Sequence, residues 1–264
     1  MASLRRRLDS HSRLKKRRFI LITAAQKKVV LITGGSRGIG RSLVNRFKQE
    51  GWYVATCARS SQSLKGSAAD FTSPCDVSQA SDVKRFIQQV IERTGKIDTL
   101  INNAGLAGSN PLTPDSTDEM WHQVIDVNLH GAYYMCKYVT PYLPDNTGRI
   151  INVSSVLGLK GVPDQTAYCA AKHGVIGLTR ALALHLAARK ITVNAVCPGW
   201  VRTEMAAERM KAIGILEASF STSVPLGRFI EPQEISDYIY QVASTPGFAM
   251  ITGQALTIDG GALL

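Results

Sequence analysis

The sequence lacks the patterns that mark disulfide-rich, metal-binding and membrane-spanning proteins. Its five cysteines are scattered over 264 residues without a Cys-x-x-Cys pair or a metal-ligand spacing. This distribution predicts no metal site and a reducing compartment. The apolar run Phe19–Ala25 has only seven residues, whereas a membrane-spanning helix needs about 20. We therefore expect no transmembrane segment.

Acidic residues are also few, because 20 Asp and Glu stand against 31 Lys and Arg, a net charge of +11. Residues 1–28 hold ten Lys or Arg and one Asp, which is +9 of that total and leaves +2 for the remainder. A basic, nearly acid-free start is typical of organellar transit peptides. It is also compatible with a flexible arm, a mis-assigned start, or a tether to nucleic acid or acidic lipid.

We expect residues 1–26 to form a flexible extension and residues 27–264 to form one folded domain, with no nucleic-acid contact by that domain. The predicted location is cytoplasmic, and a mitochondrial or plastid location is the alternative if the extension is a transit peptide.

The content of 45% apolar residues suffices for one large α/β domain. Apolar, β-branched runs predict strands, and amphipathic stretches between them predict helices. The expected strands are Val29–Thr33, Tyr53–Cys57, Phe71–Cys75, Thr99–Asn102, Arg149–Val153, Ile191–Val196 and Ala255–Ile258. The expected helices are 38–50, 79–94, 116–142, 166–188 and 231–243. This alternation predicts a single-domain Rossmann fold, a doubly wound parallel sheet with helices on both faces.

One corner of this sheet is expected to be thin. The stretch 60–67 leaves room for only a short helix, and Pro74 removes a hydrogen-bond donor from the third strand. Because proline is tolerated mainly at sheet edges, we expect this strand at the edge of a 3-2-1-4-5-6 order.

A glycine-rich turn follows the first expected strand. Gly34, Gly38 and Gly40 are spaced Gly-x-x-x-Gly-x-Gly and precede an amphipathic stretch. A strand, glycine turn and helix in this order let backbone N–H groups and a helix N-terminus meet a pyrophosphate. The pattern predicts a dinucleotide site, although the spacing differs from the common Gly-x-Gly-x-x-Gly.

The charges near this turn indicate which dinucleotide binds. An NAD-selecting fold places an acid at the end of the second strand, where this chain has Ala58 and then Arg59. Arg37 lies inside the glycine turn. Two guanidinium groups can hold a 2′-phosphate by charge-assisted bonds, so NADP(H) is preferred and NAD(H) is the alternative.

Tyr168 and Lys172 are one helical turn apart and therefore share a helix face. A phenol has an ordinary pKa near 10, and a neighbouring cation lowers that pKa and makes the phenol a usable acid or base. Ser155 precedes Tyr168 by thirteen residues, at the end of an expected buried strand.

Together these motifs resemble the short-chain dehydrogenase/reductase family, from about Lys27 to Leu264. The resemblance also rests on Cys75-Asp76-Val77, Asn102-Asn103-Ala104-Gly105, Asn128 and Pro198-Gly199. It implies NAD(P) across the carboxyl edge of the sheet and carbonyl–alcohol chemistry.

The resemblance implies a role for each catalytic residue. Tyr168 would donate the proton and Ser155 would orient the carbonyl oxygen. Lys172 would hold the nicotinamide ribose and lower the Tyr168 pKa, and Asn128 would anchor a relay water. The implied cofactor residues are Gly34, Ser36, Arg37, Gly38, Ile39, Gly40, Arg59, Asp76, Val77, Asn102, Ala104, Gly105, Tyr168, Lys172, Pro198, Gly199, Val201 and Thr203. The implied substrate contacts are Ser155, Leu157, Gln165, Tyr168, Trp200 and Met205, beneath a lid formed by residues 204–224.

Gln165 and the ending 252–261 resemble 3-oxoacyl-thioester reductases, whereas Leu184 stands where a base that docks a carrier protein is expected. A thioester on carrier protein, a thioester on CoA and a free ketone therefore stay open as substrates of an NADPH-dependent carbonyl reductase. The alternatives are an NAD-linked dehydrogenase of a small alcohol, sugar or steroid, and a catalytically idle Rossmann module tethered by its basic tail. Apolar stripes on helices 116–142 and 166–188 predict a homotetramer or a dimer.

Overall fold

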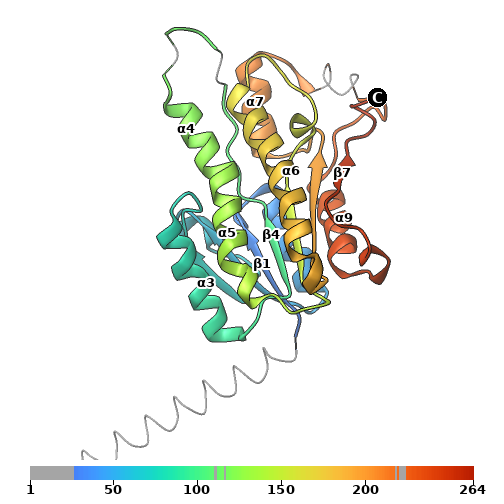
Figure 1. Cartoon of the computed structure of the whole chain (residues 1–264). Helices are drawn as coiled ribbons and strands as arrows, with labels where there is room; N and C mark the ends of the chain where they lie inside the picture. Colours follow the sequence, from blue (N-terminus) through green and yellow to red (C-terminus); the bar gives the residue numbers. More distant parts are fainter. Residues whose placement is uncertain (1–26, 110–111, 116, 218, 220–223) are drawn as a thin grey trace, which may run out of the picture.

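The computed structural model describes residues 27–109, 112–115, 117–217, 219 and 224–264, so the predicted extension 1–26 lies outside the described residues. Its centre is a seven-stranded parallel sheet in the order β3-β2-β1-β4-β5-β6-β7 (Figure 1). The strands are β1 (Val29–Thr33), β2 (Tyr53–Ala58), β3 (Phe71–Pro74), β4 (Thr99–Asn102), β5 (Arg149–Val153), β6 (Thr192–Pro198) and β7 (Ala255–Ile258). The helices are α2 (Gly38–Gln49), α3 (Ala80–Thr94), α4 (Glu119–Ile125), α5 (Gly131–Val139), α6 (Thr166–Leu186), α7 (Glu204–Ile213) and α9 (Pro232–Ser244).

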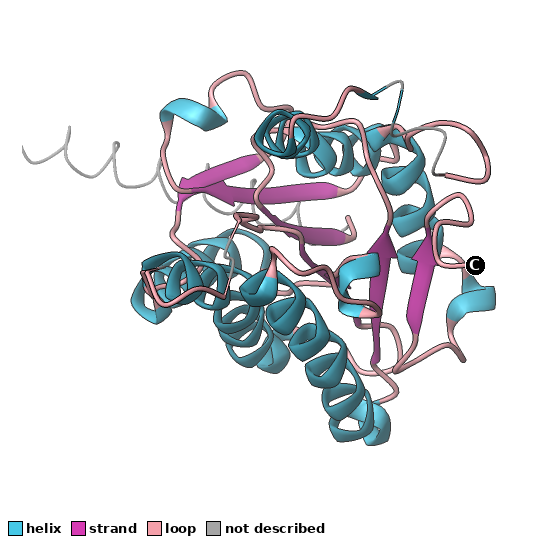
Figure 2. Ribbon diagram, turned by 90° about the horizontal axis from the view of Figure 1, so that it is seen from above, coloured by secondary structure: helices cyan, strands magenta, loops and turns pink. Residues whose placement is uncertain are grey.

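Helices cover both faces of the sheet (Figure 2). Side chains of a strand alternate between the two faces, so Val29 and Leu31 join the core under α3, α5 and α6. Val30 and Ile32 join the core under α2 and α9 instead. This arrangement confirms the predicted doubly wound parallel sheet.

The predicted edge position of the third strand and the short second crossover are both confirmed. β3 pairs only with β2, and one 3-10 turn, Gln62–Leu64, is the only helical element described between them. The predicted helix 116–142 is instead divided, because a π-helical turn, Asp126–His130, separates α4 from α5. No helix within the described ranges is both long and apolar enough to cross a membrane.

The strand order places a crevice between β1 and β4. These two strands are neighbours, but the chain leaves β1 for α2 on one face and leaves β4 for α4 and α5 on the other. Ligands of doubly wound sheets bind at such a point, beyond the carboxyl ends of the strands. The residues after β1, β4, β5 and β6 therefore surround one site.

Candidate active site

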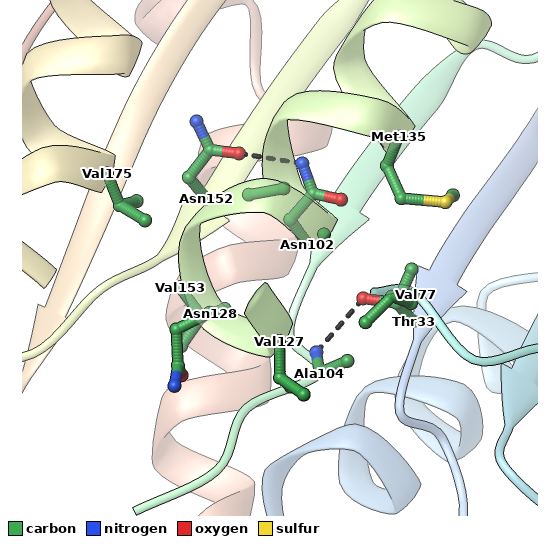
Figure 3. A pocket seen from close by; sticks show the side chains of 12 residues that line it. Thr33, Val77, Asn102, Ala104, Val127, Asn128, Met135, Asn152, Val153 and Val175 are labelled. Carbon is green, nitrogen blue, oxygen red and sulfur yellow. Dashed lines mark hydrogen bonds between the residues drawn. The ribbon is translucent and has the colours of Figure 1, made fainter. Parts of the chain in front are cut away.

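The glycine turn after β1 packs directly on the turn after β4. A side chain at Gly34, whose φ is +71°, would place its Cβ 2.9 Å from the Cα of Ala104. A Cβ at Gly40 would lie 2.0 Å from the Gly34 carbonyl oxygen. Thr33 Oγ1 accepts hydrogen bonds from the N–H groups of Asn103 (3.0 Å) and Ala104 (2.9 Å), which joins the two turns (Figure 3). Only backbone fits at these positions, so a ligand can approach the main chain closely.

The start of α2 is suited to bind an anion. Its N-cap residue, Arg37, makes no side-chain capping bond, and no acidic residue lies in the first turn. The first N–H groups of the helix are therefore available to a phosphate. β2 ends at Ala58, and the exposed Arg59 follows it. These residues fit a dinucleotide that carries an additional phosphate.

Two predicted cofactor residues have other partners. The Asp76 carboxylate accepts bonds from the backbone N–H (3.0 Å) and the hydroxyl (2.7 Å) of Ser78. Arg37 Nη1 lies 3.4 Å from Glu208 Oε1 on α7. The remaining predicted cofactor residues lie near the strand ends, namely Ser36, Gly38, Ile39, Val77, Gly105, Pro198, Gly199 and Val201.

Ser155, Tyr168 and Lys172 meet beyond the end of β5. The side chains of Ser155 and Tyr168 are hydrogen-bonded to each other. Lys172 is buried, its Nζ lies 5.4 Å from the centroid of the Tyr168 ring, and it donates a 2.9 Å bond to the Val153 carbonyl. Ser154 donates its hydroxyl to the Lys172 carbonyl at 3.0 Å, which fixes this turn of α6 against β5.

The Tyr168 pKa is shifted upward, whereas the sequence predicted a downward shift. Burial raises the pKa of Tyr168 to about 12, although the hydrogen bond from Ser155 acts in the opposite direction. Burial also lowers the pKa of Lys172 to about 8. The predicted lowering of the Tyr168 pKa by Lys172 is therefore wrong for the protein alone, because removal of the phenol from water is the largest effect on this pKa. The phenol is protonated at neutral pH and is ready to donate.

Asn128 lies in the π-helical turn and is buried. Its Nδ2 donates to the carbonyls of Leu106 (2.7 Å) and Val124 (2.8 Å), and its Oδ1 accepts from the Leu106 N–H at 3.3 Å. A Cβ at Gly105 would lie 3.0 Å from Asn128 Oδ1 and 3.8 Å from Lys172 Nζ. Asn128 thus holds the turn after β4 beside Lys172, and π-helical turns are frequent at functional sites.

A buried amide network beneath this site was not predicted. Asn102 Nδ2 donates to Asn152 Oδ1 at 2.8 Å and Asn152 Nδ2 donates to Thr179 Oγ1 at 2.9 Å, and Figure 3 shows the first of these two bonds. The side chain of Asn102 therefore points into the core below the crevice. Its Oδ1 has no protein partner in the described part of the chain, and it lines a cavity of about 10 Å³, room for about one water. Asn152 is a polar residue within the otherwise apolar strand pattern of residues 150–153, and an amide at such a position could have indicated a buried polar network.

The substrate side is bounded by the start of α6 and by α7. Gln165 is buried at the N-cap of α6, and Trp200 stacks on Phe229 with ring centroids 5.7 Å apart. Leu157 and Met205 are half-buried.

Residues 204–213 of the predicted lid are helical, and Thr203 caps this helix by accepting the Ala206 N–H at 3.3 Å, as predicted. Arg209 forms an ion pair with Asp164, which joins α7 to the segment before α6. Sequence reasoning missed this pair, because its partners lie 45 residues apart.

The fold and the site together define a single-domain, dinucleotide-binding oxidoreductase with a serine, a tyrosine and a lysine at its centre. A family model described as enoyl-(acyl carrier protein) reductase matches residues 34–262. The chain is 39% identical over 254 residues to a putative ketoacyl reductase of Streptomyces coelicolor, covering 89% of this chain and 96% of the relative. It is 37% identical over 248 residues to the 3-oxoacyl-[acyl-carrier-protein] reductase FabG of Thermotoga maritima, covering 90% of this chain and 98% of the relative.

A crystal structure of an actinorhodin polyketide ketoreductase variant with NADPH is similar to the whole domain. It has a TM-score of 0.83 at 36% identity and covers 90% of this chain and 98% of that chain. The chain therefore belongs to the short-chain dehydrogenase/reductase family.

Proposed function

We propose that this protein reduces the ketone of a 3-oxoacyl thioester with NADPH. The observation that carries the proposal is the hydrogen-bonded pair of Ser155 and Tyr168, with Lys172 behind it, at the mouth of a glycine-lined crevice. The similar proteins support the substrate class, since they include 3-oxoacyl and ketoacyl reductases. The solved ketoreductase with NADPH supports the cofactor.

The cofactor residues are assigned from the fit of the crevice. The first N–H groups of α2 would hold the pyrophosphate, and Arg37 and Arg59 would hold the 2′-phosphate. Lys172 would hold the nicotinamide ribose. NADPH bound there supplies the hydride that the carbonyl carbon accepts.

Residues of the chain donate and replace the proton. Ser155 orients the carbonyl oxygen with its hydroxyl, and Tyr168, protonated at neutral pH, donates its proton to that oxygen as negative charge develops. Lys172, whose pKa is about 8, exchanges protons near neutrality and restores the phenol. Asn128 holds the backbone of Leu106 and Val124 through three hydrogen bonds, close to this lysine.

A substrate panel tests the proposal. The full chain is assayed with NADPH and with NADH on acetoacetyl-CoA, acetoacetyl carrier protein and a cyclic ketone, and with NADP+ and with NAD+ on a hexose, by absorbance of the reduced nicotinamide. The proposal expects the highest kcat/KM with NADPH and one of the two thioesters. Preference for NAD+ and the hexose would establish the dehydrogenase instead, and cofactor binding without any turnover would establish the idle module.

We also propose that the chain assembles into a homotetramer through α4, α5 and α6. Large apolar side chains on these helices remain exposed, including Trp121 (37%), Tyr133 (44%) and Leu184 (82%). Exposed aromatic and aliphatic side chains on these helices favour burial by a partner. Light scattering after gel filtration tests this assembly, and a monomeric mass at micromolar concentration would contradict it.

A further inference from the structure

The glycine turn and α7 are joined across the cofactor crevice by one ion pair. Arg37 Nη1 and Glu208 Oε1 lie 3.4 Å apart. The same helix approaches the turn at a second place, because Thr203 Cγ2 lies 3.1 Å and Glu204 Oε2 3.6 Å from the position of a Cβ on Gly38. Two carboxylates of α7 therefore face the turn, and only that of Glu208 pairs with Arg37 in the described structure.

Glu208 and the proposed position of the 2′-phosphate lie on opposite sides of Arg37. Arg37 follows β1, the 2′-phosphate position beside Arg59 follows β2, and α7 follows β6. In the sheet, β2 is on one side of β1, whereas β6 is on the other side beyond β4 and β5. A guanidinium that turns toward Arg59 must therefore leave Glu208.

We infer that Glu208 is a cofactor-specificity residue that competes with the 2′-phosphate for Arg37, so that a phosphate-bearing cofactor separates α7 from the glycine turn. The inference rests on the proposed NADPH site and deepens it. A 2′-phosphate carries up to about two negative charges, so it displaces a single carboxylate. A dinucleotide without that phosphate leaves the ion pair in place.

The size of the effect follows from exposure. The Arg37 and Glu208 side chains are 52% and 69% exposed, so their attraction is screened by solvent. Exposed pairs change an equilibrium constant by about two- to fivefold. Glu208→Gln is expected to tighten NADPH binding by about that factor and to leave NADH binding unchanged.

Binding titrations of the full chain test this, with nicotinamide fluorescence as the readout. Glu204→Gln is the matched control, because it removes the same charge one helical turn away without removing the ion pair. Its carboxylate faces the turn that meets the pyrophosphate, which both dinucleotides share. It should change both dissociation constants by the same factor. In an Arg37→Ala background, Glu208→Gln should leave the ratio of the two constants unchanged.

A second measurement reports on α7 without any nicotinamide. Hydrogen exchange of the α7 amides is followed in the protein alone, with adenosine 2′,5′-bisphosphate and with 5′-AMP. The bisphosphate should raise exchange in α7 and 5′-AMP should not, because only the former draws Arg37 away. In Glu208→Gln, α7 should exchange faster at the outset and respond to neither nucleotide.

The outcomes separate the two proposals. Equal shifts for NADPH and NADH in Glu208→Gln, or a shift that persists without Arg37, would overturn the role of Glu208. An Arg37→Ala variant with the wild-type NADPH preference would overturn the phosphate-binding role of Arg37 in the proposed function itself. Identical exchange with both nucleotides would show that α7 does not respond to the 2′-phosphate.

Discussion

Asn102 and Asn152 are paired residues of β4 and β5, and their side chains form a buried 2.8 Å hydrogen bond. The pair joins β4, which precedes the turn that packs on the glycine turn, to β5, which precedes Ser155. Asn152 extends the connection to Thr179 on α6, the helix that carries Tyr168 and Lys172. The strands that border the crevice and the helix α6 are thus held in one polar network inside the core.

Removal of Asn152 should destabilise the fold. Asn152→Leu removes two buried hydrogen bonds and leaves Asn102 Nδ2 only the Cys136 sulfur and Thr179 Oγ1 only the Val175 carbonyl as partners. We expect a cost of about 1–3 kcal/mol in the free energy of unfolding. Urea unfolding measures this cost. Asn45→Ala, at an exposed position of α2, is the control and should change stability by less than about 0.5 kcal/mol. Equal stability of the two variants would show that the network contributes little.

Tyr168→Phe should abolish proton donation while the crevice stays intact. We expect kcat to fall by about 10²–10⁴-fold and the NADPH dissociation constant to change by less than about twofold. Stopped-flow or steady-state absorbance gives the first value and fluorescence titration the second. Turnover within about tenfold of wild type would assign the proton to another group.

Gly105 is expected to tolerate a side chain poorly. Gly105→Ala places a Cβ 3.0 Å from Asn128 Oδ1, so the asparagine must shift by a few tenths of an ångström, whereas the 3.8 Å to Lys172 Nζ is an ordinary contact. A misplacement of about 1 Å costs about 10²-fold in rate, so this smaller shift should lower the rate by less than about 10²-fold. Gly177→Ala is the control, since nothing lies within 4 Å of its Cβ position. Activity of Gly105→Ala equal to that of the control would contradict the expectation.

The buried lysine should give stability a distinct pH dependence. Because burial lowers the Lys172 pKa from 10.5 to about 8, the unfolded chain binds more protons than the folded chain between these values. The unfavourable contribution of Lys172 is therefore complete below pH 8 and disappears as the pH rises to 10.5. Lys172→Met should exceed wild type in stability by up to about 3 kcal/mol more at pH 7 than at pH 10.

Denaturant unfolding at these two pH values measures that difference. The variant Lys65→Met removes a charge at an exposed position and serves as the control. If the advantage of Lys172→Met were the same at both pH values, the lysine would not be desolvated in the folded protein.

Arg59→Asp should weaken NADPH binding by about tenfold or more, because a carboxylate beside the 2′-phosphate replaces a cation. The same carboxylate can accept a bond from a ribose 2′-hydroxyl, so NADH binding should hold or improve. Fluorescence titration with both cofactors gives the ratio. Parallel loss of both affinities would indicate damage to the crevice rather than a change of specificity.

The motifs were predictable because each is local: the glycine turn and Ser155 follow the ends of strands, and Tyr168 and Lys172 are one helical turn apart on α6. The run before Gly34 and the run before Ser155 both show the apolar pattern of a buried strand, and parallel strands bring their carboxyl ends to one edge. The predicted order of the strands in the sheet followed from the same pattern, and Pro74 indicated that the third strand lies at the edge.

Contacts between distant segments were not predictable. Arg37 and Glu208 are 171 residues apart, and both are ordinary surface types in the sequence. The predicted direction of the Tyr168 pKa shift was wrong for a related reason. The spacing to Lys172 shows that a cation is near, but the degree of burial depends on packing by other elements, and burial dominates.

The adjacency of β1 and β4 also affects how the chain folds while it is being synthesised. β1 is complete at Thr33, but its partner on the crevice side is not complete until Asn102. Protein chains emerge from the ribosome at about 5–20 residues per second, so β1 waits several seconds for that neighbour. During this interval one edge of an apolar strand is unpaired, and a partner molecule that protects it would improve the yield of folded enzyme.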